Sequence, residues 1–109
     1  MPALYQQHCV NTSYPALTDK DELHALLLKT ENWQLSSDNK HIEKTFSFND
    51  YQQTSQFVNA VIDIAQQQDH HPDISFSYKQ CSIRYSTHSA GGLTMNDFIC
   101  AARIDHLDI

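Results

Sequence analysis

The sequence predicts an α+β domain in which three helices pack on one face of a four-stranded antiparallel sheet. Two observations predict this class. The apolar residues change between helical spacing and alternation in the order helix, two strands, helix, two strands, helix. The 109 residues suffice for one domain with one modest core. Residues 1–17 follow neither pattern, so we expect an irregular N-terminal surface arm and a single domain over residues 18–109.

The domain is expected to begin with a helix followed by a hairpin. Thr18 with Asp21 three positions later resembles a capping box, which predicts a helix over residues 19–30. From Trp33 to Phe48 the apolar residues recur at every second position on either side of a polar turn. This alternation predicts two antiparallel strands joined as a hairpin.

The second predicted helix covers residues 50–68 and is the longest element. Asn49 is a candidate N-cap, and the apolar residues that follow form one stripe at helical spacing. Pro72 prevents the helix from continuing, because proline has no amide hydrogen and disfavours the helical conformation of the residue before it. His70 and His71 are therefore expected where this helix ends.

The second predicted hairpin comprises residues 74–78 and 81–85, in which apolar and polar residues alternate. The alternation shifts by one position between the two segments, which indicates a tight connection. Tyr78 lies on the apolar side of its strand, where it is either part of the core or the wall of a pocket. We expect His88 at the end of the fourth strand.

A turn and a third helix complete the predicted domain. Gly91 and Gly92 supply a flexible turn. Thr94 with Asp97 repeats the capping box, which predicts a helix over residues 95–107. Because the third helical position is where a capping acid belongs, Asp97 is either a cap alone or a cap with a second, functional role.

Composition argues against several classes of protein. The net charge is −6, and the seven Lys and Arg residues are scattered singly, whereas a nucleic-acid groove needs clustered positive charge. No apolar run approaches the ~20 residues that span a bilayer, and the N-terminus lacks an export signal. Cys9, Cys81 and Cys100 form no CxxC pair, so we expect reduced thiols in a cytoplasmic protein without membrane contact.

Three histidines are candidates for proton transfer, because imidazole has an ordinary pKa of about 6.5. If the loops holding His70, His71 and His88 converge at one end of the sheet, one imidazole can donate a proton while another accepts one. The alternatives are structural: His70 as a partner of the helix dipole and His88 as an ordinary strand-end residue. The remaining histidines are expected on the surface: His8, His24, His41 and His106.

A metal site is the main chemical rival to proton transfer, since three histidines and a carboxylate can bind zinc. Adjacent histidines are a poor ligand pair, however, and the H-E-x-x-H spacing is absent. The sequence also has no G-x-S-x-G nucleophile elbow and no glycine-rich phosphate loop. Nucleophilic catalysis and nucleotide chemistry are therefore not expected.

Residues 18–107 contain a series of spaced motifs: Phe46-Ser47-Phe48-Asn49-Asp50-Tyr51, Phe57, Asp69-His70-His71-Pro72-Asp73, Tyr78, Thr87-His88, Gly92-Leu93-Thr94 and Asp97. In these motifs the chain resembles the pterin-4a-carbinolamine dehydratase family. The resemblance implies conversion of 4a-hydroxytetrahydrobiopterin to quinonoid dihydrobiopterin and water, the recycling step after an aromatic amino acid hydroxylase. It also implies that no metal or organic cofactor is needed and that the protein forms homodimers or homotetramers.

The resemblance assigns site residues position by position. The catalytic histidines would be His70, His71 and His88, with His70 and His88 as acid and base and His71 holding the pterin. The supporting or substrate-binding positions would be Gln66, Asp69, Pro72, Tyr78, Thr87 and Asp97. Gln66 departs from the family, which usually has an acid at this position, and a neutral amide cannot raise a histidine pKa by charge.

The resemblance leaves a second class of function open. An animal member of the family serves as a dimerisation cofactor of a transcription factor, so a protein-binding module is the alternative to an enzyme. A His-rich metal-binding module is the third and weaker alternative.

Overall fold

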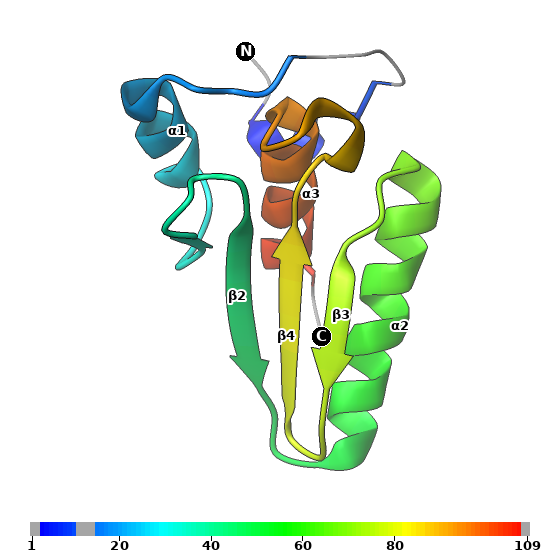
Figure 1. Ribbon diagram of the computed structural model, residues 1–109. Coiled ribbons are helices and arrows are strands. Elements are labelled where there is room, and N and C mark those ends of the chain that lie inside the picture. Colours follow the sequence, from blue (N-terminus) through cyan, green and yellow to red (C-terminus); the bar gives the residue numbers. More distant parts are fainter. Residues whose placement is uncertain (1–2, 11–14, 108–109) are drawn as a thin grey trace.

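The computed structural model describes residues 3–10 and 15–107, and it confirms the predicted fold class. Four antiparallel strands form one sheet in the order β1-β2-β4-β3, so each predicted hairpin is present. Figure 1 shows the three α-helices on the same side of this sheet. The strands are β1 (Gln34–Leu35), β2 (Ile42–Ser47), β3 (Asp73–Phe76) and β4 (Gln80–Tyr85), and the helices are α1 (Lys20–Leu27), α2 (Tyr51–Gln68) and α3 (Met95–Asp105).

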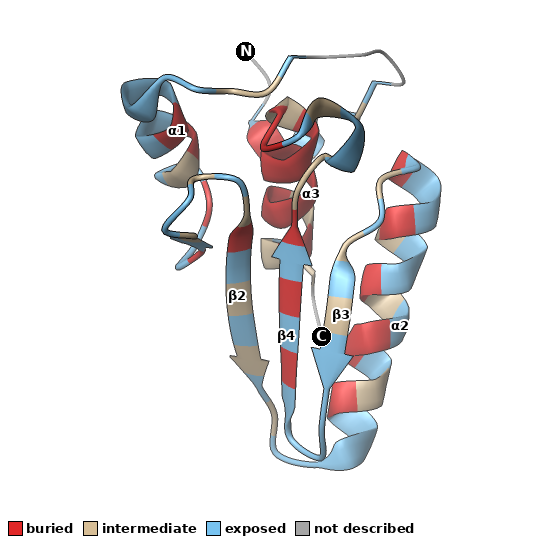
Figure 2. Cartoon of the chain, viewed as in Figure 1, coloured by how far each residue is buried: buried red, intermediate tan, exposed pale blue. Residues whose placement is uncertain are grey.

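The core lies between the sheet and the helices, with β4 at its centre. Along β4, the side chains of Cys81, Ile83 and Tyr85 are fully buried, and they alternate with exposed polar residues. Val61 of α2 and Phe98 of α3 are also fully buried in this cluster. Figure 2 shows buried residues on the inner sides of the helices and exposed residues on their outer sides. Each such side chain stabilises the fold by roughly 1.5–3 kcal/mol.

The predicted N-caps of the first two helices are wrong by one residue. Asp19, not Thr18, caps α1, and its carboxylate accepts the amide of Asp21 at 3.0 Å. Asp50, not Asn49, caps α2, and its carboxylate accepts the amide of Gln53 at 2.8 Å. In both places two capping residues are adjacent, and the aspartate is the one that accepts the amide at the positive end of the helix.

The described part of the N-terminal arm is docked against α3. Residues Leu4–Gln6 form a short 3₁₀ helix, η1, and the Leu4 side chain is buried in the core. Arg103 of α3 donates from Nε to the carbonyl of Gln7 at 2.9 Å. The expectation of an irregular surface arm is therefore wrong for residues 3–10. The expectation failed because the apolar and polar residues that dock the arm show no period in the sequence. Residues 11–14 lie outside the described part.

Candidate active site

The end of α2 places His70 at the rim of the core. Asp69 takes the left-handed conformation, with φ of 52°, and the amide of His70 donates to the carbonyl of Ala65 at 3.1 Å. This hydrogen bond closes the helix in the manner of a helix C-terminal motif. β3 begins at Asp73 directly after Pro72, so the histidine pair occupies the sharp bend that the sequence predicts.

His70 and Asp97 form the central contact of the site. His70 Nε2 lies 2.6 Å from Asp97 Oδ1, with the His70 side chain 13% exposed and the Asp97 side chain fully buried. The other carboxylate oxygen, Oδ2, accepts the Thr87 hydroxyl at 2.8 Å and the Thr94 amide at 2.9 Å. Three donors therefore converge on one buried carboxylate. The predicted capping box of α3 is confirmed, and Asp97 binds His70 as well.

This environment fixes which His70 nitrogen exchanges protons. Because the Asp97 carboxylate accepts at Nε2, Nε2 carries a proton in both the neutral and the charged ring. Nδ1 makes no hydrogen bond within the described part of the chain, and it is not fully buried. Burial of the ring opposes its charged form, but the hydrogen bond to Asp97 and the charge of that carboxylate outweigh burial and raise the pKa of His70.

Tyr85 supports the same imidazole from the sheet. The rings of His70 and Tyr85 are stacked, with centroids 5.2 Å apart, and the Tyr85 hydroxyl donates to the His70 carbonyl at 3.3 Å. Burial raises the pKa of Tyr85 far above its ordinary value, so its hydroxyl remains a donor. In the sequence, Tyr85 is one more apolar position of a strand, and nothing there marks it as a support for the site.

His71 and His88 are both exposed, and both lie between His70 and Asp97 in the sequence. His88 follows Thr87, whose hydroxyl binds Asp97, so its loop reaches the same end of the sheet. The placement of His88 at the end of a strand is wrong: β4 ends at Tyr85, and His88 begins a second 3₁₀ helix, η2 (His88–Ala90).

His88 lines a shallow hollow of about 180 Å³ together with Lys40 and His41. Gly91 lines it too and takes a positive φ of 73°, which confirms the predicted need for glycine in this turn. The expectation that His41 is a surface residue is wrong, because its ring is half-buried and its Nδ1 is buried without a hydrogen-bond partner. His8, His24 and His106 are exposed as expected.

Tyr78 is not brought to the histidines within one chain. The turn that joins β3 to β4 is closed by the Ser77 amide bonding to the Gln80 carbonyl, so Tyr78 is a loop residue, 64% exposed. Thr54, near the start of α2, donates to the Tyr78 carbonyl at 3.1 Å, whereas His70 follows the end of that helix. The separation along the helix is about 21 Å. The expected core or pocket position is therefore wrong, because the alternation runs into the first residue of a two-residue loop.

The other predicted positions have supporting or peripheral places. Gln66 is exposed in the last turn of α2, Asp69 is its left-handed cap, and Pro72 is half-buried. No sequence pattern marks Gln68, a buried amide whose Oε1 accepts the amide of Cys9 at 2.8 Å. This hydrogen bond ties the N-terminal arm to the helix end that carries His70.

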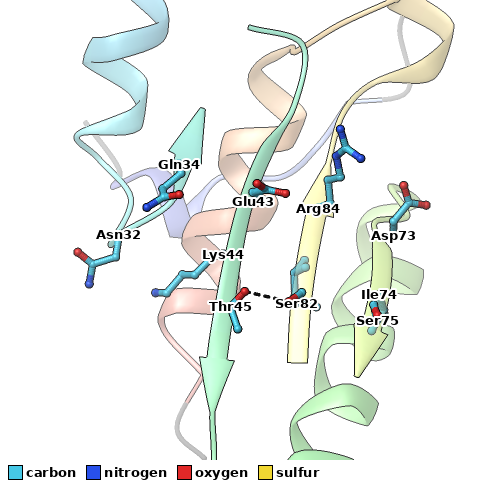
Figure 3. Close-up of a pocket in the computed structure, with 11 residues that line it drawn as sticks. Asn32, Gln34, Glu43, Lys44, Thr45, Asp73, Ile74, Ser75, Ser82 and Arg84 are labelled. Atoms are coloured by element: carbon cyan, nitrogen blue, oxygen red, sulfur yellow. Dashed lines mark hydrogen bonds between the residues drawn. The ribbon is translucent and has the colours of Figure 1, made fainter. Parts of the chain in front are cut away.

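A larger hollow lies on the open face of the sheet, away from the helices. It measures about 630 Å³, and Figure 3 shows polar side chains of β2, β3 and β4 around it, including the hydrogen-bonded pair Thr45 and Ser82. These side chains are the outward half of the strand alternation, and none of the three candidate histidines lines the hollow. The three candidate proton-transfer histidines therefore lie outside this hollow.

Two further properties concern the described residues 3–10 and 15–107. No group of three His, Cys, Asp or Glu side chains among them is arranged to hold a metal ion. None of their helices is both long enough and apolar enough to cross a membrane.

The fold and the site together define an α+β protein with a buried carboxylate that orients a partly buried histidine. Comparison with known proteins makes the class specific. The family model described as pterin 4 alpha carbinolamine dehydratase matches residues 16–107. The chain belongs to this family.

Individual relatives agree with the family match. A Nitrosomonas eutropha protein named "Putative pterin-4-alpha-carbinolamine dehydratase" is 53% identical over 81% of this chain and 77% of its own length. A Legionella pneumophila protein of the same name is 40% identical over 95% of this chain and 94% of its own. The crystal structure of a transcriptional coactivator/pterin dehydratase from Brucella melitensis has a TM-score of 0.77 at 27% identity, covering 82% of this chain and 94% of that one.

Proposed function

We propose that this protein dehydrates 4a-hydroxytetrahydrobiopterin to quinonoid dihydrobiopterin by histidine acid–base catalysis. The observation that carries the proposal is the His70–Asp97 pair, a 2.6 Å contact to a fully buried carboxylate that leaves His70 Nδ1 without a hydrogen bond to the described part of the chain. A fixed, partly buried imidazole of raised pKa is suited to hold a proton near neutral pH and to release it to a bound substrate.

The proposed reaction removes one hydroxyl group and one proton from the pterin. Protonated His70 donates from Nδ1 to the C4a hydroxyl oxygen, the C–O bond breaks, and the oxygen leaves as water. His88 accepts the proton that a ring nitrogen loses as the quinonoid double bonds form. His71, exposed beside His70, holds the pterin by hydrogen bonding. Asp97 serves as the hydrogen-bond acceptor for His70, Thr87 and Thr94.

The proposal extends to the setting in which the enzyme works. We expect it in the cytoplasm, recycling the pterin product of an aromatic amino acid hydroxylase. We also expect a homodimer or homotetramer, since β1 and β3 are edge strands and edges favour pairing with another copy.

A dehydration assay on the 4a-hydroxy intermediate tests the proposal directly. Wild-type protein should speed the loss of the intermediate above its spontaneous rate. His70→Ala and His88→Ala should each lower kcat by about 10²–10⁴-fold, the usual contribution of a general acid or base. His24→Ala, an exposed histidine on α1, is the matched control and should keep wild-type kcat. Wild-type protein no faster than the spontaneous reaction would overturn the proposal.

A protein-binding function is the second candidate, favoured by the description of the Brucella melitensis protein as a transcriptional coactivator/pterin dehydratase. The two candidates differ in their dependence on the histidines. A His70→Ala/His71→Ala double variant that has lost dehydration should lose biological function if the protein acts as an enzyme. Full biological function of that variant, with a partner retained in a pull-down, would favour the binding role instead.

A further inference from the structure

A pair of cysteine thiols lies beside the candidate active site and has no part in the proposed reaction. Cys9 Sγ in the N-terminal arm and Cys100 Sγ in α3 are 3.4 Å apart, although 91 positions separate them in the sequence. Cys100 is fully buried, whereas Cys9 is half-buried and so accessible from solvent. A disulfide needs an S–S distance of about 2.05 Å, so the two sulfurs have only about 1.4 Å left to close.

Hydrogen bonds on both sides of Cys9 hold its thiol against α3. The Cys9 amide donates to Gln68 Oε1 at 2.8 Å. The amide of Val10 donates to Asn96 Oδ1 at 3.2 Å, and Asn96 Nδ2 donates back to the Val10 carbonyl at 3.1 Å. Gln68 and Asn96 are both buried. The proximity of the thiols therefore results from a built contact between the arm and the ends of two helices.

The surroundings give the two thiols different reactivity. The hydrogen bond from the Cys100 thiol lowers the pKa of Cys9, and burial opposes this. The charge of His70 adds to the lowering, the charge of Asp97 opposes it, and the charge of Arg103 adds to it. The same hydrogen bond and burial raise the pKa of Cys100 well above its ordinary range. Because the thiolate is the reactive form of cysteine, Cys9 is the attacking thiol and Cys100 the resolving one.

We propose that Cys9 and Cys100 form an oxidation site at which a peroxide converts the thiol pair into an intrachain disulfide joining the N-terminal arm to α3. This inference does not depend on the dehydratase proposal. The disulfide would lie next to the helix ends that carry His70 and Asp97, since Cys100 is three positions after Asp97 on α3.

The chemistry balances with one hydrogen peroxide. The Cys9 thiolate attacks one peroxide oxygen, the O–O bond breaks, and the departing hydroxide takes up the proton that Cys9 released and leaves as water. The resulting sulfenic acid is attacked by Cys100 sulfur, the S–O bond breaks, and the hydroxide leaves as water with the Cys100 proton. Two sulfurs are oxidised by one electron each, and the two peroxide oxygens are reduced.

Treatment of the reduced, folded protein with hydrogen peroxide, followed by alkylation under denaturing conditions, tests the proposal. We expect an intact mass lower by two hydrogens, one alkylated cysteine, and a non-reduced peptide that links Cys9 to Cys100. A dithiol should reverse the change. The oxidised protein should unfold at a temperature higher by on the order of 10 °C, because the disulfide closes a loop of nearly the whole chain.

Cys81 is the internal control. It is fully buried in β4, and burial raises its pKa to about 11. Cys81→Ala should still form the disulfide, whereas Cys9→Ser and Cys100→Ser should not. The peptide map of the wild-type protein shows whether Cys9 and Cys100 are joined even if a variant fails to fold. Three alkylatable thiols after oxidation, a stable sulfinic acid on Cys9, or a disulfide that includes Cys81 or joins two chains would each overturn the proposal.

Discussion

Replacing Asp97 with asparagine should change both the protonation and the tautomer of His70. The asparagine side chain keeps one carbonyl oxygen, which can accept from the Thr87 hydroxyl and the Thr94 amide as Oδ2 does now. Its NH₂ group then faces His70 Nε2, which must accept rather than donate. The ring proton moves to Nδ1. Nδ1 can then no longer accept a proton, and it no longer alternates between a protonated and an unprotonated form.

The expected cost in stability follows from the contacts that are lost. The charged His70–Asp97 contact is replaced by a neutral one, and a hydrogen bond to a charged group contributes about 1.5–3 kcal/mol. The first turn of α3 also loses a negative charge near the helix N-terminus. The free energy of unfolding should therefore fall by about 2–4 kcal/mol at pH 6.

The difference between wild type and Asp97→Asn should depend on pH in a defined direction. Asp97 raises the pKa of His70 in the folded protein above the unfolded value of about 6.5. A raised histidine pKa contributes stability that is full below the unfolded pKa and is lost as pH rises through the folded pKa. Urea unfolding from pH 6 to 8.5 should therefore show a difference that is largest at pH 6 and shrinks as pH rises.

Asp105→Asn is the matched control. Asp105 also lies on α3 with its side chain 1% exposed, and it accepts from Trp33 Nε1, Lys44 Nζ and the Glu31 amide at 2.8–2.9 Å. This variant should lose comparable stability but keep kcat, whereas Asp97→Asn should lower kcat by about 10²-fold or more. An unchanged His70 titration by NMR in Asp97→Asn, or equal losses of kcat in both variants, would refute the reasoning.

Three further substitutions test the surroundings of the site. Gln66→Glu should leave the pH–rate profile superimposable on wild type, because the side chain is exposed and solvent screens its charge; a shifted profile would show an electrostatic role. Tyr78→Ala should change the free energy of unfolding by less than about 1 kcal/mol, since an exposed loop residue loses its stacking on Tyr51 and the contact of its ring with the Lys79 ammonium; a larger loss in urea unfolding would contradict its exposed position. Gly91→Ala should cost about 1–2 kcal/mol in the same measurement because of its positive φ, and Gly91→Asn should cost less; equal stability of all three proteins would contradict the left-handed turn.

The sequence predicts the fold well because its signals are local and repeat along each element. The stripe of α2 and the alternation of β4 each fix a buried face, and both are found where expected. The predictions are wrong where the start or end of an element depends on a single residue. Asp19 and Asp50 replace their neighbours as caps, and Tyr78 continues an alternation that the turn has already ended.

The site is less predictable, because its central contacts join residues that are distant in the sequence. His70 and Asp97 are 27 positions apart, and only the packing of α3 beside the end of α2 brings them to 2.6 Å. Docking of the arm depends on Gln68 and Asn96, two buried amides in elements otherwise recognised by their apolar residues. Spacing motifs find the histidines, but they do not reveal which nitrogen is held or what holds it.

Asp97 shows why a structural and a functional interpretation of one residue need not compete. As a capping acid it needs one oxygen, and Oδ2 supplies that oxygen to the Thr94 amide. Because the cap fixes Oδ2, it also fixes the direction of the second oxygen, and Oδ1 hydrogen-bonds to His70 Nε2. The same cap that starts α3 thus fixes the carboxylate in the rotamer that orients the imidazole. Loss of the cap would be expected to loosen the site even if the charge at Asp97 were kept.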